Sequence, residues 1–81
     1  MPIPGQIRAA RALLNISQEQ LAKTVGISIP TVKRAESDHP GAHNVADETR
    51  KKIHAALENA GIEFLDGDEP GVKLKRKPRR R

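Results

Sequence analysis

The side chains of this sequence that could do chemistry are histidines, a group of acids and a run of Lys and Arg. His39 and His43 are four residues apart, a spacing that binds metal on a helix, but a Pro-Gly pair separates them and no third ligand is apparent. The acids of residues 66–69 lack the spacing and the closing glutamate of a calcium loop. The chain has no Cys, no phosphate-binding glycine loop and no nucleophile motif. The sequence therefore predicts a protein that is not an enzyme and carries no metal or cofactor.

The basic side chains are distributed unevenly along the chain. Residues 73–81 hold seven of the fifteen Lys and Arg residues and no acid, whereas residues 1–72 carry eight basic and ten acidic side chains. A nucleic-acid partner would therefore meet a local positive surface on the body, and the tail would add long-range attraction. The single aromatic residue, Phe64, is too little for the stacking platforms of single-strand binders.

The elements that must position these side chains are predicted to be mainly helical. Apolar residues recur at helical spacing in four segments, at about Gln6–Leu14, before Gly26, at about Ile29–Glu36 and between Asp47 and Gly61. The positions expected to face a core are Ile7, Ala10, Leu13, Leu14, Leu21, Ala22, Val25, Val32, Ala35, Ile53, Ala56, Leu57 and Ala60.

Capping residues stand at the predicted helix ends. Ser17 and Gln20 match a capping box at the start of the second helix, because each side chain can bond to the backbone amide of the other. Ser28 suits the N-cap of the third helix, with Pro30 in its first turn, and Asp47 can cap the fourth. Residues that tolerate positive φ follow the first, second and fourth segments: Asn15, Gly26 and Gly61.

The C-terminal part changes character. Ile62–Leu65 is strand-like, residues 66–71 are rich in turn formers, and residues 72–75 alternate apolar and basic side chains. This pattern predicts a β-hairpin, or an arm that pairs with a second copy. From Arg76 onward we expect a disordered basic tail, because like charges repel and nothing apolar remains to bury. The expected organisation is a helical domain over residues 1–61, a hairpin or arm over 62–75 and a tail over 76–81.

Two short helices joined by a tight glycine turn predict a helix-turn-helix. Ala22 supplies the small residue where the helices touch, and Gly26 supplies the turn. The segment from Ile7 to Ser37, centred on Gln18–Ser28, resembles the Cro/repressor-like helix-turn-helix proteins, also called the XRE family. A plain helical bundle is the alternative.

The resemblance implies that the third helix enters the major groove of DNA. The positions that match the family's base-contacting residues are Ile29, Pro30 and Arg34, with Lys33 close by. An Arg34 guanidinium can donate two hydrogen bonds to guanine, and Ile29 can touch a thymine methyl group. Many relatives carry polar residues where Ile29 and Pro30 stand. Because these two side chains offer fewer hydrogen bonds to bases, DNA recognition would depend more on DNA shape or on phosphate contacts. The alternative for Arg34 and Lys33 is contact with phosphates only.

Further residues have expected roles near the DNA backbone and inside the protein. The phosphate contacts implied by the resemblance or by position are Gln18, Thr31, Ser37 and His43. For Gln18, a plain capping role is the alternative. The resemblance also implies a structural ion pair between Arg11 in the first helix and Glu36 at the end of the third.

The function expected from these features is sequence-specific binding of double-stranded DNA by a transcriptional regulator, most simply a repressor. A homodimer on paired half-sites would compensate for the few base contacts of one short helix. No apolar run could span a membrane and no signal peptide is apparent, so we expect a cytoplasmic, nucleoid-associated protein. The alternatives are an antitoxin or anti-activator that mainly binds a partner protein, and an RNA or ribosome binder that depends on the tail.

Overall fold

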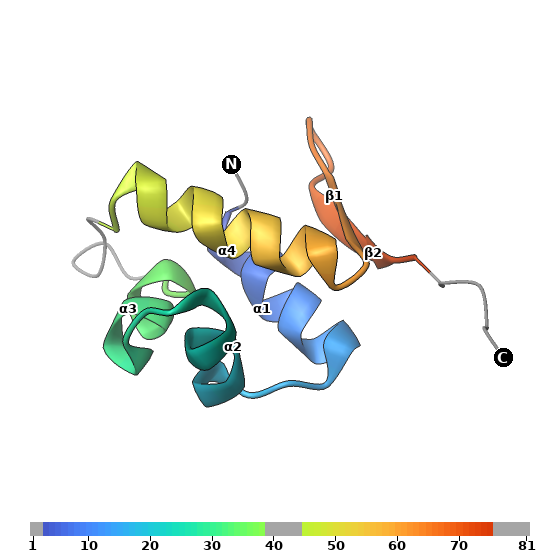
Figure 1. The fold of residues 1–81 in the computed structure, drawn as a ribbon. Coiled ribbons are helices and arrows are strands. Elements are labelled where there is room, and N and C mark those ends of the chain that lie inside the picture. The colour runs from blue at the N-terminus through green and yellow to red at the C-terminus, as the bar shows by residue number, and fades with distance from the viewer. Residues whose placement is uncertain (1–2, 39–44, 76–81) are drawn as a thin grey trace, which may run out of the picture.

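The computed structural model describes residues 3–38 and 45–75 as four helices followed by a two-stranded antiparallel sheet (Figure 1). The elements follow the chain in the order α1 (Pro4–Leu14), α2 (Gln18–Val25), α3 (Ile29–Ala35), α4 (Asp47–Asn59), β1 (Ile62–Leu65) and β2 (Gly71–Leu74). This confirms the predicted mainly α fold with a C-terminal hairpin. The tail predicted over residues 76–81 lies outside the described residues.

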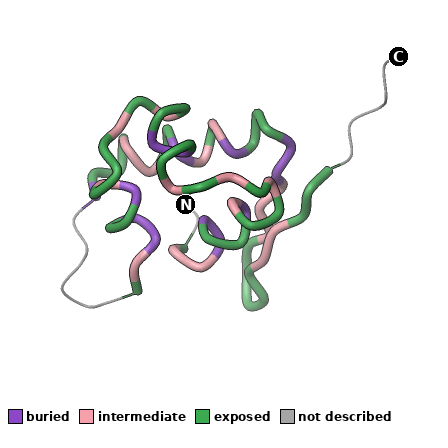
Figure 2. Tube along the Cα trace, turned by 90° about the horizontal axis from the view of Figure 1, so that it is seen from below, coloured by how far each residue is buried: buried purple, intermediate pink, exposed green. Residues whose placement is uncertain are grey.

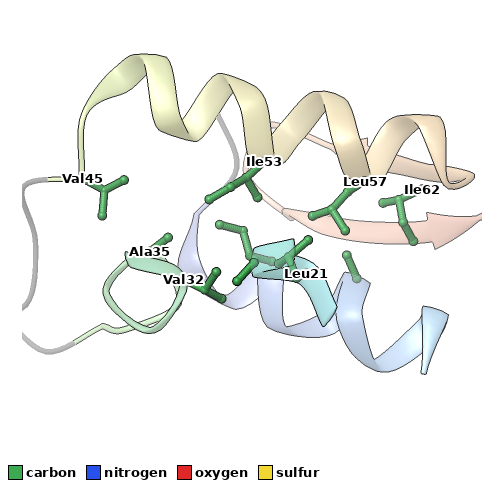
Figure 3. Close-up of a cluster of buried hydrophobic side chains, with 10 residues drawn as sticks. Leu21, Val32, Ala35, Val45, Ile53, Leu57 and Ile62 are labelled. Atoms are coloured by element: carbon green, nitrogen blue, oxygen red, sulfur yellow. The ribbon is translucent and has the colours of Figure 1, made fainter. Parts of the chain in front are cut away.

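A single apolar core joins the helices and the hairpin. In Figure 3, α4 lies on one side of the core and α1, α2 and α3 lie on the other, with Ile53 and Leu57 projecting from α4 between them. Buried and exposed stretches alternate along the helices, as expected for amphipathic helices around one core (Figure 2). The buried apolar side chains are Ile7, Ala10, Leu21, Ala22, Val32, Ala35, Val45, Ile53, Leu57 and Ile62. Each large member stabilises the fold by about 1.5–3 kcal/mol.

Two residues predicted to face the core, Leu13 and Ala60, are exposed instead. Leu13 is 45% exposed, because the buried face of α1 follows Ile7 and Ala10 to Leu14 and Leu13 lies to one side of that line. Ala60 is exposed because α4 ends at Asn59 and Ala60 only caps it, so it leaves the helical stripe. Ala56 is half-buried at the edge of the same stripe.

The predicted helix ends around α2 are confirmed. The Ser17 hydroxyl accepts from the Gln20 amide (3.0 Å), and the Gln20 carbonyl oxygen accepts from the Ser17 amide (2.8 Å). Asn15 and Gly26 have φ of 58° and 86°, so both occupy the left-handed region that ends α1 and α2. Ser28 caps α3 by accepting from the Thr31 amide (3.2 Å).

Other predicted ends were wrong by one or two residues. Asp47 is the first residue of α4, and Ala46 occupies the capping position, so Asp47 acts only as an acid in the first turn. The first helix begins at Pro4 rather than at Gln6, because proline suits a first helical turn. The third helix ends at Ala35, and Glu36 follows as its C-cap.

The hairpin is fixed to α1 by a buried glutamine. In the sheet, Ile62 lies opposite Leu74 and Leu65 opposite Gly71. Gln6 is only 4% exposed, and its Nε2 donates to the carbonyl oxygens of Leu65 and Gly71, both at 2.9 Å. Its Oε1 accepts from the Ile3 amide (2.9 Å), so the whole amide group is paired. This contact makes the hairpin a docked part of the helical body.

Candidate nucleic-acid interface

A tight turn at Gly26 joins α2 to α3. The amides of Gly26 and Ile27 both donate to the carbonyl oxygen of Ala22, at 2.8 and 3.0 Å. Ala22 is 3% exposed, and its small side chain allows α2 and α3 to pack directly against each other. Two helices held across a short glycine turn in this way form a helix-turn-helix.

The two sides of α3 differ completely in their surroundings. Val32 and Ala35 are fully buried and hold the helix on the core. The residues predicted to contact bases all lie on the exposed side: Ile29, Pro30, Lys33 and Arg34. Ile29 is 37% exposed, a large apolar side chain that the core does not use. A rigid helix therefore presents an apolar leading end and two cations to solvent.

The end of α3 is held by a charged junction around Glu36. The Glu36 side chain is 3% exposed, and its carboxylate accepts from Arg11 Nε (2.6 Å) and Nη2 (3.0 Å). Arg11 Nη1 also donates to the Ile16 carbonyl oxygen at 3.0 Å. A third donor to the carboxylate is Gln18 Nε2, at 3.0 Å, from the first residue of α2. One carboxylate thus fixes α1, α2 and α3 relative to one another.

The ion pair also changes the titration of Arg11. Its hydrogen bond to Glu36 is the main cause of a raised pKa, which partial burial opposes and the negative charge of Glu36 supports. Because the folded-state pKa is the higher one, the resulting stability is present below the ordinary pKa of arginine and is lost only as the pH rises through the raised value. Because the ordinary pKa of arginine already lies far above neutrality, Arg11 is charged at every physiological pH with or without this shift.

Comparison with protein families agrees with this geometry. A family model described as Helix-turn-helix matches residues 7–58, more than half of the chain and nearly all of the segment from α1 to α4. This chain belongs to the Cro/repressor-like, or XRE, helix-turn-helix family. It is therefore a DNA-binding regulator of the helix-turn-helix type. No curated protein matches the sequence.

In this helix-turn-helix protein, the predicted phosphate contacts lie in different surroundings. Gln18 is half-buried and engaged with Glu36. The half-buried Thr31 places its hydroxyl 2.7 Å from that of Ser28 at the start of α3. Ser37 is half-buried just after α3, and its amide donates to the Arg34 carbonyl oxygen (3.2 Å). His43, like His39, lies outside the described residues.

Two further contacts of this helix-turn-helix protein were not predicted from the sequence. Arg8 donates from Nη1 to the Glu36 carbonyl oxygen and from Nη2 to Asp38 Oδ2 (3.0 Å), so it caps the end of α3 from α1. The bond from Gln18 to Glu36 was missed as well. The one available signal for Arg8 is its position one turn before Arg11, on the side of α1 that faces the end of α3. Within residues 3–38 and 45–75, no helix is long and apolar enough to cross a membrane.

Proposed function

We propose that this protein represses transcription by binding specific sequences of double-stranded DNA with α3 in the major groove. The observation that carries the proposal is the division of α3 into a buried side and an exposed side that bears Ile29, Pro30, Lys33 and Arg34. A helix fixed in this way can hold a guanidinium against a guanine edge. Such a protein would be associated with the nucleoid.

We assign a different role in DNA binding to each successive segment of the chain. We assign base and phosphate recognition to residues 1–61, dimer contacts to residues 62–75 together with the adjoining surface of α1, and nonspecific attraction to DNA to residues 76–81. Ile29 and Pro30 carry no side-chain hydrogen-bond donor, so recognition at the start of α3 depends on contact with thymine methyl groups and on DNA shape.

The experiment is in-vitro selection of bound duplexes at near-physiological salt. We expect a palindromic motif, and we expect Arg34→Ala to relax the preference at one base pair per half-site by about 1–3 kcal/mol. Lys52→Ala is the matched control, because Lys52 is an exposed cation on α4 and its loss changes the net charge equally. Equal binding of all sequences by the unchanged protein would defeat the proposal of a specific regulator.

A two-fold homodimer requires a self-complementary surface, and we propose that this surface lies where α1 and β2 meet. Leu13 and Leu74 are 45% and 42% exposed. The hydrogen bond between Gln6 and Gly71 gives a common starting point on α1 and β2. Leu13 lies two helical turns after Gln6 along α1, and Leu74 lies three residues after Gly71 along β2. Because β2 packs along α1 and both intervals span about 10 Å, we expect the two leucines to lie near each other. An uncharged patch opposes no like charges in a two-fold contact.

Sedimentation of the free protein tests this dimer. We expect Leu13→Gln combined with Leu74→Gln to shift the protein toward monomer and to weaken binding to the palindrome more than binding to one half-site. Lys73→Ser is the control, because Lys73 lies in the same strand but alternates to its other face. A monomer–dimer equilibrium that the leucine substitutions leave unchanged would place the dimer surface elsewhere.

A further inference from the structure

The Glu36 junction suggests a role beyond holding the fold. Glu36 takes three side-chain hydrogen bonds, two from Arg11 and one from Gln18 Nε2 at 3.0 Å. The bonds to Arg11 account for an ion pair between α1 and α3. The bond to Gln18 is different, because it joins the buried carboxylate to a half-buried side chain at the leading end of α2.

We propose that Glu36 is a positioning residue for DNA binding, which holds the Gln18 amide so that one of its N–H groups is directed at a backbone phosphate. This inference rests on the proposed function, with Gln18 at the backbone phosphate where the family resemblance places it. A glutamine amide has two donor hydrogens on Nε2, and they diverge. When one is bound to Glu36 Oε1, the other points away from the carboxylate and remains available to an acceptor outside the protein.

The bond also decides which way the amide faces. A free glutamine side chain can present either its oxygen or its nitrogen to a phosphate, and only the nitrogen attracts. Glu36 accepts hydrogen bonds but donates none when ionised, so it selects the orientation in which Nε2 faces it. The side chain then loses less conformational entropy when DNA binds, because it is already ordered.

Arg11 makes this arrangement compatible with a phosphate. An isolated carboxylate next to a phosphate-binding amide would repel the DNA backbone. Arg11 is bonded to both carboxylate oxygens, at 2.6 and 3.0 Å, and carries the compensating charge. Glu36 can thus orient Gln18 without presenting a net negative charge at the proposed contact.

The first test is made without DNA, by measuring the mobility of side-chain NH₂ groups by NMR relaxation. The three glutamines form an internal scale. Gln6 donates twice through Nε2 from a buried position and is the rigid reference, whereas Gln20 is exposed and anchored only through its oxygen. We expect the Gln18 NH₂ group of the unchanged protein to be nearly as rigid as that of Gln6. A Gln18 NH₂ group as mobile as that of Gln20 would overturn the inference, and this result needs no variant.

The second test is a double-mutant cycle on affinity for the selected duplex. We expect Gln18→Ala to weaken binding about tenfold, the loss of one hydrogen bond to a charged group. Arg11→Met with Glu36→Met removes the acceptor of Gln18 and keeps an apolar junction of similar size. This pair should weaken binding about threefold to tenfold when Gln18 is present and should change nothing further when Gln18 is already alanine.

The controls separate positioning from charge and from the proposed function itself. Glu58→Gln removes an exposed carboxylate on α4 and should leave both the Gln18 NH₂ mobility and the affinity unchanged. Additive losses in the cycle would overturn the inference even if Gln18→Ala weakens binding. A rigid Gln18 whose replacement leaves affinity unchanged would instead refute the phosphate contact on which the inference rests.

Discussion

At the scale of single residues, two buried polar side chains explain how the parts of the molecule keep their places. Glu36 joins α1, α2 and the end of α3, and Gln6 joins α1 to both strands of the hairpin. Both are almost completely buried, at 3% and 4% exposed, and every polar atom of each has a partner. Buried polar groups that are fully paired restrict a fold to one arrangement, because any other arrangement would leave them unpaired.

Gln6→Leu tests this at one position. The substitution keeps the approximate volume but removes the donor to two partly buried carbonyl oxygens, so we expect the free energy of unfolding to fall by about 1–3 kcal/mol. Urea unfolding measures the loss, and hydrogen exchange should locate it in β1 and β2. Gln20→Leu is the control, because Gln20 is exposed and bonds only within its own capping box. Equal losses in the two variants would show that Gln6 does not fix the hairpin.

At the scale of elements, local sequence patterns predicted most of the helices and the hairpin. The capping box at Ser17 and the turn at Gly26 depend on residues a few positions apart, so they can be read from the sequence alone. The exposure of Leu13 and the roles of Gln6 and Arg8 could not be predicted in this way. Gln6 binds residues 59 and 65 positions away, and Arg8 binds one 28 positions away. Such contacts depend on how the elements pack, which periodicity does not specify.

The turn between α2 and α3 makes a sharp prediction about backbone conformation. Gly26 has φ of 86°, and a Cβ atom built there meets no other atom within 4 Å. Gly26→Ala should therefore cost about 1–2 kcal/mol through backbone strain alone, with no steric clash. Asn15→Gly is the matched substitution, because Asn15 occupies the same left-handed region at φ of 58° and glycine adopts it freely. Thermal unfolding that shows equal effects for the two substitutions would contradict this account.

At the scale of the whole molecule, the tail continues from the end of β2 that lies across the molecule from α3 (Figure 1). β2 ends at Leu74, and the amide of Lys75 still donates to the Gly61 carbonyl oxygen (2.7 Å), so the part of the tail beyond the hairpin begins at Arg76. Removal of the tail should therefore start at this residue, because an earlier cut would break the hairpin. Under the proposed function, the tail and α3 would be separate means of binding DNA, one nonspecific and one specific.

Replacing the five basic residues of 76–81 with serine should weaken binding at low salt and leave the selected sequence unchanged. Each phosphate that the tail no longer neutralises should reduce the slope of log K against log salt by about 0.9. If each basic residue neutralises one phosphate, the slope should become shallower by about 4.5. Affinity for the selected and a scrambled duplex, measured over a salt series, provides the slope. A changed sequence preference would show that the tail reads bases.

The contact of Gln6 with the hairpin also limits when the fold of this protein can form during synthesis. Gln6 leaves the ribosome early, but its acceptor on Gly71 does not exist until 65 more residues have been added. Throughout that interval α1 lacks the strand against which it packs. The apolar surface that β2 later covers is therefore accessible to chaperones. The contact between Gln6 and Gly71 therefore joins two segments made 65 residues apart, and it cannot form while the hairpin is still inside the ribosome.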